Sequence, residues 1–169
     1  TLGLRGDLPV DGLVDMYRGM VDVGRTCGAV IAGGDIVRSP VFFVTVALTG
    51  TATTPDGPLL TRAAAVPGDQ VAVTGSLGCS AGGFRMLTEN LEFDDQTSIH
   101  LSRAHNRPVP RIAEGLTLAA NGVVAAIDIS DGLVDDLGKL CKSSGLGAVI
   151  RTDKIPIDDQ LKRAFPDEW

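Results

Sequence analysis

The sequence predicts an α/β or α+β fold in which short strands alternate with helices. Three observations support this prediction. Apolar residues at helical spacing alternate along the chain with short runs rich in β-branched residues. Of the 169 residues, 44% are hydrophobic, which suffices for a core, but only 4% are aromatic, so we expect a core of Val, Leu, Ile and Ala. The 21 glycines suggest many tight turns and close backbone approaches.

The N-terminal part of the chain is predicted to contain one helix and two strands. Apolar side chains recur mostly at helical spacing over 11–27, and Gly28 is expected to end this helix as a C-cap glycine. A short buried strand is predicted over 29–35. Residues 40–50, rich in β-branched and aromatic side chains, form the strongest predicted strand.

A change in composition predicts where the chain divides. The segment TATTPDGP, residues 51–58, has the composition of a turn or linker. We place a domain boundary within it, so the two predicted domains cover residues 1–54 and 55–169.

The second predicted domain continues the alternation of strands and helices. We expect strands at 70–74, 122–129 and 147–153, helices at 80–90, 110–120 and after residue 132, and a helical turn at 97–104. The glycine-rich loop before the helix at 80–90 lacks the ending of a Walker A loop. It could still offer backbone N–H groups to an anion, but close helix packing is the expected use of Gly82 and Gly83.

Composition excludes several classes of function. A net charge of −6 argues against a nucleic-acid surface, which needs a basic patch. No apolar run reaches the ~18 residues of a membrane span. The three cysteines form no CxxC pair, so neither a disulfide framework nor a zinc site is indicated. A reducing compartment is expected, and we predict a cytoplasmic location.

Two carboxylates stand where the predicted strand at 122–129 gives way to a helix. Asp128 would be costly to desolvate at the end of an apolar strand unless a cation paired with it. Mg²⁺ takes oxygen ligands from one or two carboxylates and from phosphates, so Asp128 and Asp131 are candidate magnesium ligands. The structural alternative is that Ser130 or Asp131 caps the following helix.

Three other features could carry chemistry, each with a structural alternative. Asp35 follows two glycines and is a further candidate carboxylate, unless this segment is only a turn between strands. Arg62 offers a guanidinium that suits phosphate, although most surface arginines bind none. Cys79 lies near a helix start, where its pKa could fall, or it is simply a small buried residue. We expect the two histidines to be solvated or hydrogen-bonded rather than catalytic.

Four segments, taken together in their order and spacing, resemble the thiamine-monophosphate kinase family. They read IAGGDIVRSP, LLTRAAAVPGDQVAVTGSLGCSAGG, HNRPVPR and AIDISDGLVDDLG. The family belongs to the superfamily of aminoimidazole-ribonucleotide synthetase and selenophosphate synthetase. The resemblance implies a two-domain synthetase-superfamily fold, with a truncated N-terminal ATP-binding, barrel-forming half and the first part of a C-terminal α/β domain. It also implies a homodimer.

The resemblance implies a reaction and a set of site residues. The reaction is direct transfer of the ATP γ-phosphoryl group to thiamine monophosphate, with Mg²⁺ present. Asp35, Asp128 and Asp131 match metal ligands of the family. The nucleotide contacts are matched by Gly34, Arg62 and Ser130. No side chain is expected to act as a general base, because the acceptor phosphate is already ionised at neutral pH.

The chain also departs from the family pattern. The family's usual Gly-Asp-Ser reads Gly-Cys-Ser at 78–80, and its usual Arg-Ser-Gly-Ala reads Arg-Ala-Ala-Ala at 62–65. An upstream GDDAA-type metal motif and a downstream GGEDYEL-type segment are expected outside this sequence. We therefore expect an internal piece that is inactive alone. Two alternatives remain open: a sister ATP-dependent synthetase, and a non-catalytic nucleotide- or metal-binding domain.

Overall fold

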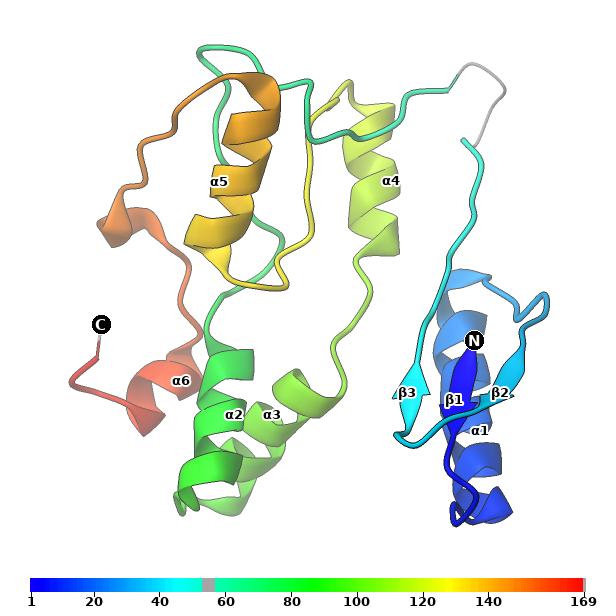
Figure 1. Cartoon of the computed structure of the whole chain (residues 1–169). Coiled ribbons are helices and arrows are strands. Elements are labelled where there is room, and N and C mark those ends of the chain that lie inside the picture. The colour runs from blue at the N-terminus through cyan, green and yellow to red at the C-terminus, as the bar shows by residue number, and fades with distance from the viewer. Residues whose placement is uncertain (53–56, 169) are drawn as a thin grey trace. The chain divides into compact units, whose positions relative to one another are not determined.

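The computed structural model describes residues 1–52 and 57–168, and the chain divides into two compact units, Thr1–Gly57 and Pro58–Trp169 (Figure 1). The predicted domain boundary between residues 54 and 55 lies outside the described residues. The mixed α/β class that the sequence predicts is confirmed, with helices in both units and a small sheet in the first.

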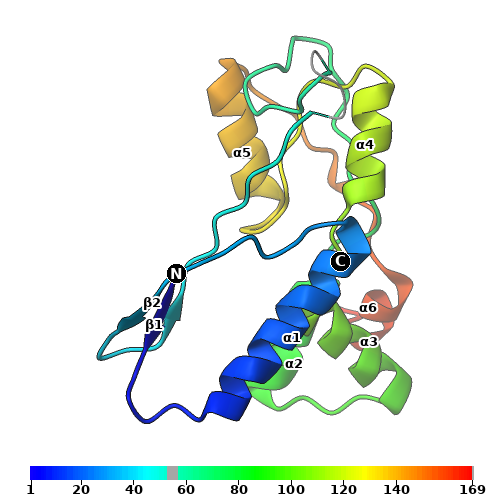
Figure 2. The ribbon, with the colours of Figure 1, turned by 90° about the vertical axis from the view of Figure 1, so that its right-hand side faces the viewer.

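The N-terminal unit pairs three short strands into one sheet. The elements are β1 (Leu2–Leu4), α1 (Val10–Cys27), β2 (Ile36–Arg38) and β3 (Phe43–Val44). The strand order is β2-β1-β3. β1 runs parallel to β2 and antiparallel to β3, and β1 and β2 lie side by side in both ribbon views (Figure 2).

Helix α1 follows the sequence prediction closely. It begins one residue before the predicted range and ends at Cys27 as expected. Gly28 has φ 70°, and its backbone N–H donates to the carbonyl of Gly24. This left-handed conformation is one that glycine adopts without strain, so the predicted C-cap is confirmed.

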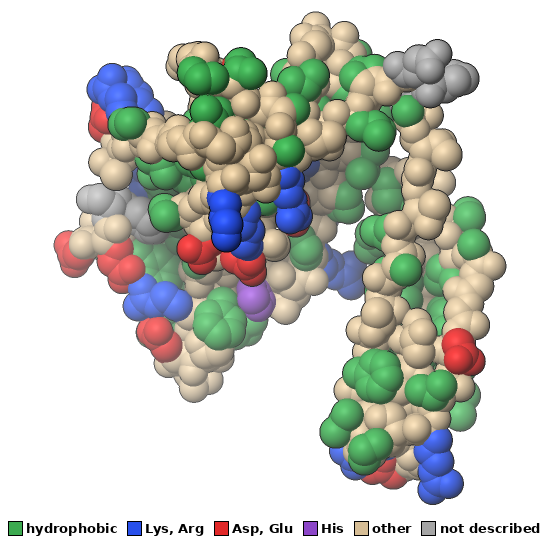
Figure 3. Space-filling model, turned by 45° about the horizontal axis from the view of Figure 1, so that its top comes forward, with side chains coloured by type: hydrophobic (Ala, Val, Ile, Leu, Met, Phe, Trp, Pro, Cys, Tyr) green, Lys and Arg blue, Asp and Glu red, His purple; other side chains and the backbone are tan. Residues whose placement is uncertain are grey.

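The two strands predicted after α1 are wrong in extent. Residues 29–35 form no strand and are exposed rather than buried, and within 40–50 only Phe43–Val44 is a strand. A strand needs a hydrogen-bonding partner, and the central strand β1 is only three residues long. Apolar side chains such as Val30 and Leu48 are therefore left 86% and 88% exposed, and hydrophobic side chains are visible at the surface in Figure 3.

The unit Pro58–Trp169 is built mainly from helices. They are α2 (Cys79–Glu89), α3 (Asp95–Asn106), α4 (Ile112–Ala120), α5 (Leu133–Ser144) and α6 (Asp159–Ala164), with a 3₁₀ turn at Thr152–Lys154. The helices predicted at 80–90, at 110–120 and after residue 132 are confirmed. The turn predicted at 97–104 is part of the longer helix α3, and α6 was not predicted from the sequence.

The three strands predicted in this unit are wrong. Among its described residues, β-pairing is limited to two isolated parallel bridges, Thr61 with Ala125 and Leu77 with Ile157. The segments 70–74 and 147–153 have strand-like composition, but no neighbouring strand in the described part of the unit extends a ladder to them. Composition predicts an extended backbone, whereas strand pairing depends on a second strand lying beside the first.

The core of this unit lies where α2, α3 and α6 meet. It contains Met86, Leu101, Leu161 and Phe165, of which Leu101 is fully buried. A Cβ atom on Gly83 would lie 2.2 Å from the carbonyl oxygen of Leu101. Close helix packing is therefore the role of this glycine, as predicted. No helix within the described residues has the length and hydropathy needed to cross a bilayer.

Candidate nucleotide and metal site

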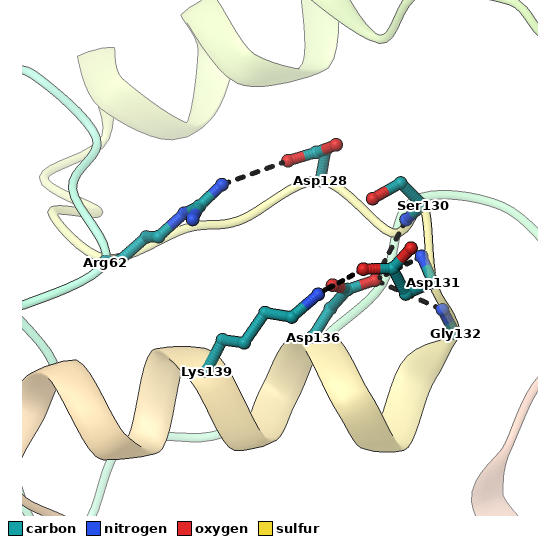
Figure 4. Close-up of polar contacts among 7 residues, drawn as sticks. All are labelled: Arg62, Asp128, Ser130, Asp131, Gly132, Asp136 and Lys139. Atoms are coloured by element: carbon teal, nitrogen blue, oxygen red, sulfur yellow. Dashed lines mark hydrogen bonds and ion pairs between the residues drawn. The ribbon is translucent and has the colours of Figure 1, made fainter.

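The loop before α5 is held by a carboxylate from inside the helix. Asp136 is only 2% exposed. Its Oδ2 accepts hydrogen bonds from the backbone N–H groups of Ser130 at 2.9 Å, Asp131 at 2.9 Å and Gly132 at 3.2 Å (Figure 4). Three donors converging on one oxygen fix the backbone of this loop relative to the first turn of α5.

Lys139 completes this arrangement from the next turn of α5. Its Nζ donates to Asp136 Oδ1 at 2.7 Å and also pairs with the Asp131 carboxylate. Lys139, together with the three backbone N–H groups, holds the pKa of the Asp136 carboxyl well below its usual range, although burial acts in the opposite direction. The two carboxylates in turn raise the pKa of Lys139. Asp136 and Lys139 are therefore both charged at neutral pH.

The predicted helix cap is wrong. Gly132 occupies the N-cap position of α5 with φ 125°, a conformation that favours glycine. Among the described contacts, no side-chain oxygen of Ser130 or Asp131 accepts a hydrogen bond from an N–H group in the first turn of α5, and the Asp131 carboxylate pairs with Lys139 instead. The sequence reasoning missed Asp136 and Lys139. Their spacing of three residues on one helix face was the signal that could have revealed the pair.

Asp128 is exposed, which contradicts the desolvation argument made from the sequence. Its side chain is 75% exposed and residues 122–129 do not form a strand. A carboxylate in water requires no bound cation. What the structure places beside it is Arg62, whose Nη2 lies 3.8 Å from Asp128 Oδ1 (Figure 4).

A single backbone bridge brings these two segments together. The N–H of Thr61 donates to the carbonyl of Val124 at 2.9 Å, and the N–H of Ala126 donates to the carbonyl of Thr61 at 3.0 Å. This pairing places Arg62 next to the segment that carries Asp128. Four of the predicted site residues, namely Arg62, Asp128, Ser130 and Asp131, therefore lie in one unit on two neighbouring segments.

The other two predicted site residues lie in the N-terminal unit. Gly34 and Asp35 are both exposed. The Asp35 carboxylate accepts a hydrogen bond from the N–H of Ile36 at 2.9 Å, and its carbonyl accepts one from Leu2 at 2.8 Å. Asp35 thus stands immediately before β2 with its backbone tied to β1.

The chemistry of the loop suits a phosphorylated ligand with a divalent cation. Asp128 and Asp131 present exposed carboxylate oxygens, their side chains being 75% and 64% exposed. Arg62 and Lys139 supply cationic groups beside them. Carboxylate oxygens are the protein ligands that Mg²⁺ prefers, and guanidinium and ammonium groups bind phosphate oxygens.

Comparison with known proteins identifies the family. Residues 66–168 match the family described as AIR synthase related protein, C-terminal domain. The chain belongs to this family. The matched AIR synthase related region includes the loop 128–132 and the whole of α5.

Curated relatives of this chain include proteins named thiamine-monophosphate kinase. The protein from Salmonella typhimurium is 41% identical over 138 residues, which cover 81% of this chain and 41% of that protein. The protein from Bacillus subtilis is 31% identical over 159 residues, which cover 91% of this chain and 48% of that protein. The chain thus spans less than half the length of these two relatives.

Solved structures of thiamine-monophosphate kinases are also similar to this chain. AaThiL complexed with AMPPCP and TMP aligns with a TM-score of 0.78 at 27% identity, covering 96% of this chain and 51% of that one. Thiamine-monophosphate kinase from Stenotrophomonas maltophilia aligns with a TM-score of 0.77 at 28% identity, covering 96% and 51%. The resemblance to thiamine-monophosphate kinase that the sequence motifs predict is confirmed.

Proposed function

We propose that this chain is part of an enzyme that transfers the γ-phosphoryl group of ATP to the phosphate of thiamine monophosphate, giving thiamine diphosphate. The observation that carries the proposal is the placement of Arg62 beside Asp128, next to the loop that Asp136 holds in place. The relatives named thiamine-monophosphate kinase and the AMPPCP and TMP complex of a structural neighbour support the choice of substrates.

Asp128 and Asp131 are the proposed magnesium ligands in the larger unit. Both carboxylates are exposed, and each has a cationic side chain beside it. Exposed ion pairs of this kind contribute little to stability, typically ~0–1 kcal/mol, so a metal–phosphate ligand can displace them at low cost. Bound Mg²⁺ would neutralise phosphoryl oxygens.

Arg62 and Ser130 are the proposed nucleotide contacts in this unit. The Arg62 guanidinium is 57% exposed and can pair with a phosphate in place of Asp128. The Ser130 backbone is fixed by Asp136, so its hydroxyl is presented from a defined position. Gly34 as a nucleotide contact and Asp35 as a magnesium ligand are proposed on the family resemblance alone.

The chemistry needs no general base from the protein. Phosphoryl transfer to an ionised phosphate depends on in-line positioning and on neutralisation of the oxygens. We further propose a homodimeric, cytoplasmic enzyme that binds neither nucleic acid nor membrane. The net charge of −6 is consistent with the exclusion of nucleic acid.

The test is a kinase assay on the full-length protein with thiamine monophosphate, ATP and Mg²⁺. Asp128→Asn and Asp131→Asn are expected to lower kcat/KM by at least ~100-fold, as removal of an electrostatic stabiliser does, while unfolding curves stay near wild type. Asp153→Asn removes a carboxylate that is also exposed, at 59%, and paired with Arg151, and it serves as the control. Unchanged turnover in the Asp128→Asn variant would contradict the proposed role of Asp128 as a metal ligand.

Two alternatives are separated by the same assay. A sister ATP-dependent synthetase would consume ATP only with another acceptor, so thiamine monophosphate would give no product. A non-catalytic binding domain would bind ATP with Mg²⁺ and show no turnover with any acceptor. Formation of thiamine diphosphate excludes both.

A further inference from the structure

We propose that Cys79, His100 and Asp158 form a binding site for one zinc-type transition-metal ion, independent of the proposed nucleotide site. Each residue offers one ligand atom, and the three atoms lie within 4.8 Å of one another. His100 Nε2 lies 3.5 Å from Cys79 Sγ and 3.3 Å from Asp158 Oδ1. All three residues belong to the unit Pro58–Trp169.

Two of the three separations between these atoms match the edges of a zinc tetrahedron. Bonds of ~2.3 Å to sulfur, ~2.05 Å to nitrogen and ~2.1 Å to oxygen, joined at the tetrahedral angle, place sulfur ~3.5 Å from nitrogen and nitrogen ~3.4 Å from oxygen. The observed separations are 3.5 Å and 3.3 Å. The third separation, between Cys79 Sγ and an Asp158 carboxylate oxygen, is within 4.8 Å, so the three side chains can close around one ion.

Three separate elements supply the ligands. Cys79 is the first residue of α2, His100 lies within α3, and Asp158 caps α6. Asp158 Oδ1 accepts hydrogen bonds from the N–H groups of Gln160 at 2.8 Å and Leu161 at 3.3 Å, which orients the carboxylate. Such hydrogen bonds from outside the coordination shell are typical of ligating carboxylates.

Exposure of the site permits entry of an ion. The side chains of His100 and Asp158 are 39% and 23% exposed, so a water molecule can reach the fourth coordination position. One thiolate, one imidazole and one carboxylate favour Zn²⁺ over Mg²⁺ or Ca²⁺, which prefer oxygen ligands alone. The lack of a CxxC pair had argued against a zinc site in the sequence. The three proposed ligands are instead distant from one another along the chain, so no local spacing pattern reveals them.

A reactive cysteine is the competing explanation, and the environment disfavours it. Burial, together with the charge of Asp158 and a hydrogen bond to it, raises the pKa of Cys79 to about 11. The prediction that the helix start lowers the pKa of Cys79 is therefore wrong. A protonated thiol is a poor nucleophile at neutral pH. A bound ion would displace this proton and link α2, α3 and α6.

The site can be tested on the purified, reduced, metal-free chain. Zn²⁺ titrated calorimetrically should bind at one ion per chain and raise Tm, and Co²⁺ should give a thiolate charge-transfer band. Cys79→Ser should abolish the band. Both Cys79→Ser and His100→Gln should weaken Zn²⁺ binding by more than ~10-fold. Cys141→Ser on α5, and His105→Gln on the same helix as His100, are matched controls and should retain both properties.

Two results would overturn the proposal. One is the lack of a thiolate band with Co²⁺ in the folded wild-type chain, a measurement that does not depend on any variant folding. The other is Zn²⁺ binding by a folded Cys79→Ser variant as tight as that of the Cys141→Ser control. Circular dichroism of each variant establishes that it is folded.

Discussion

Gly83 allows α2 and α3 to pack at backbone distance, and Gly83→Ala tests this packing. The new Cβ would lie 2.2 Å from the carbonyl oxygen of Leu101 and 2.9 Å from His105 Cβ. An ordinary carbon–oxygen contact is ~3.3 Å, so the helices must separate by about 1 Å. Because the obstacle is backbone, we take the upper value of ~3 kcal/mol for overpacking. Alanine has a helix propensity that is ~1 kcal/mol more favourable than that of glycine, so the net destabilisation is about 2 kcal/mol.

The matched control is Gly138→Ala in α5. Among the described atoms, nothing outside its own helix backbone and chain neighbours lies within 4 Å of a Cβ built at this position. The same substitution should therefore stabilise the chain by ~1 kcal/mol. Urea unfolding followed by far-UV circular dichroism measures both variants against wild type. A Gly83→Ala variant that unfolds at the same urea concentration as Gly138→Ala would refute the packing argument.

Charged and core side chains of the same unit provide three further tests. Lys139 and three N–H groups lower the folded-state pKa of Asp136. The ionised Asp136 carboxylate therefore stabilises the fold above its unfolded-state pKa of ~3.9, and this stabilisation is lost as pH falls below that value. Asp136→Asn should therefore show a shallower acid transition; an identical one would contradict the pairing. The pKa of Cys79 is raised from 9.0 to about 11, so stability of the metal-free chain should fall as pH rises through this interval. Cys79→Ser should remove this fall and Cys141→Ser should keep it. Leu101→Ala, at a fully buried site, should cost ~2–5 kcal/mol of unfolding free energy, whereas Ile99→Ala, 66% exposed on the same helix, should change it by less than ~1 kcal/mol; equal losses would argue against the core assignment.

Most helices were predictable from the sequence, whereas the strands were not. The helix 11–27 ends at Gly28 because local signals, namely apolar periodicity and a C-cap glycine, are sufficient to define it. The segment 40–50 has strong strand composition but only Phe43–Val44 pairs. Strand formation depends on a partner elsewhere in the chain, which local composition does not describe.

The candidate site was predictable only in part, for a related reason. The motif AIDISDG drew attention to Asp128 and Asp131, but the argument from desolvation failed because Asp128 is exposed. The hydrogen bonds from residues 130–132 to Asp136 were not anticipated. They depend on a helix carboxylate turning back to the loop that precedes it.

The sequence by itself determined most of the helices, the mixed α/β class and the family motifs, because these reside in periodicity, capping residues and short contiguous patterns. Only the tertiary structure decided which side chains meet. Arg62 reaches Asp128 through the bridge between Thr61 and Ala125. Cys79 meets His100 and Asp158 although the latter is 79 residues further along the chain. Such contacts depend on which distant segments and helices come together in the tertiary structure, which no local pattern in the chain specifies.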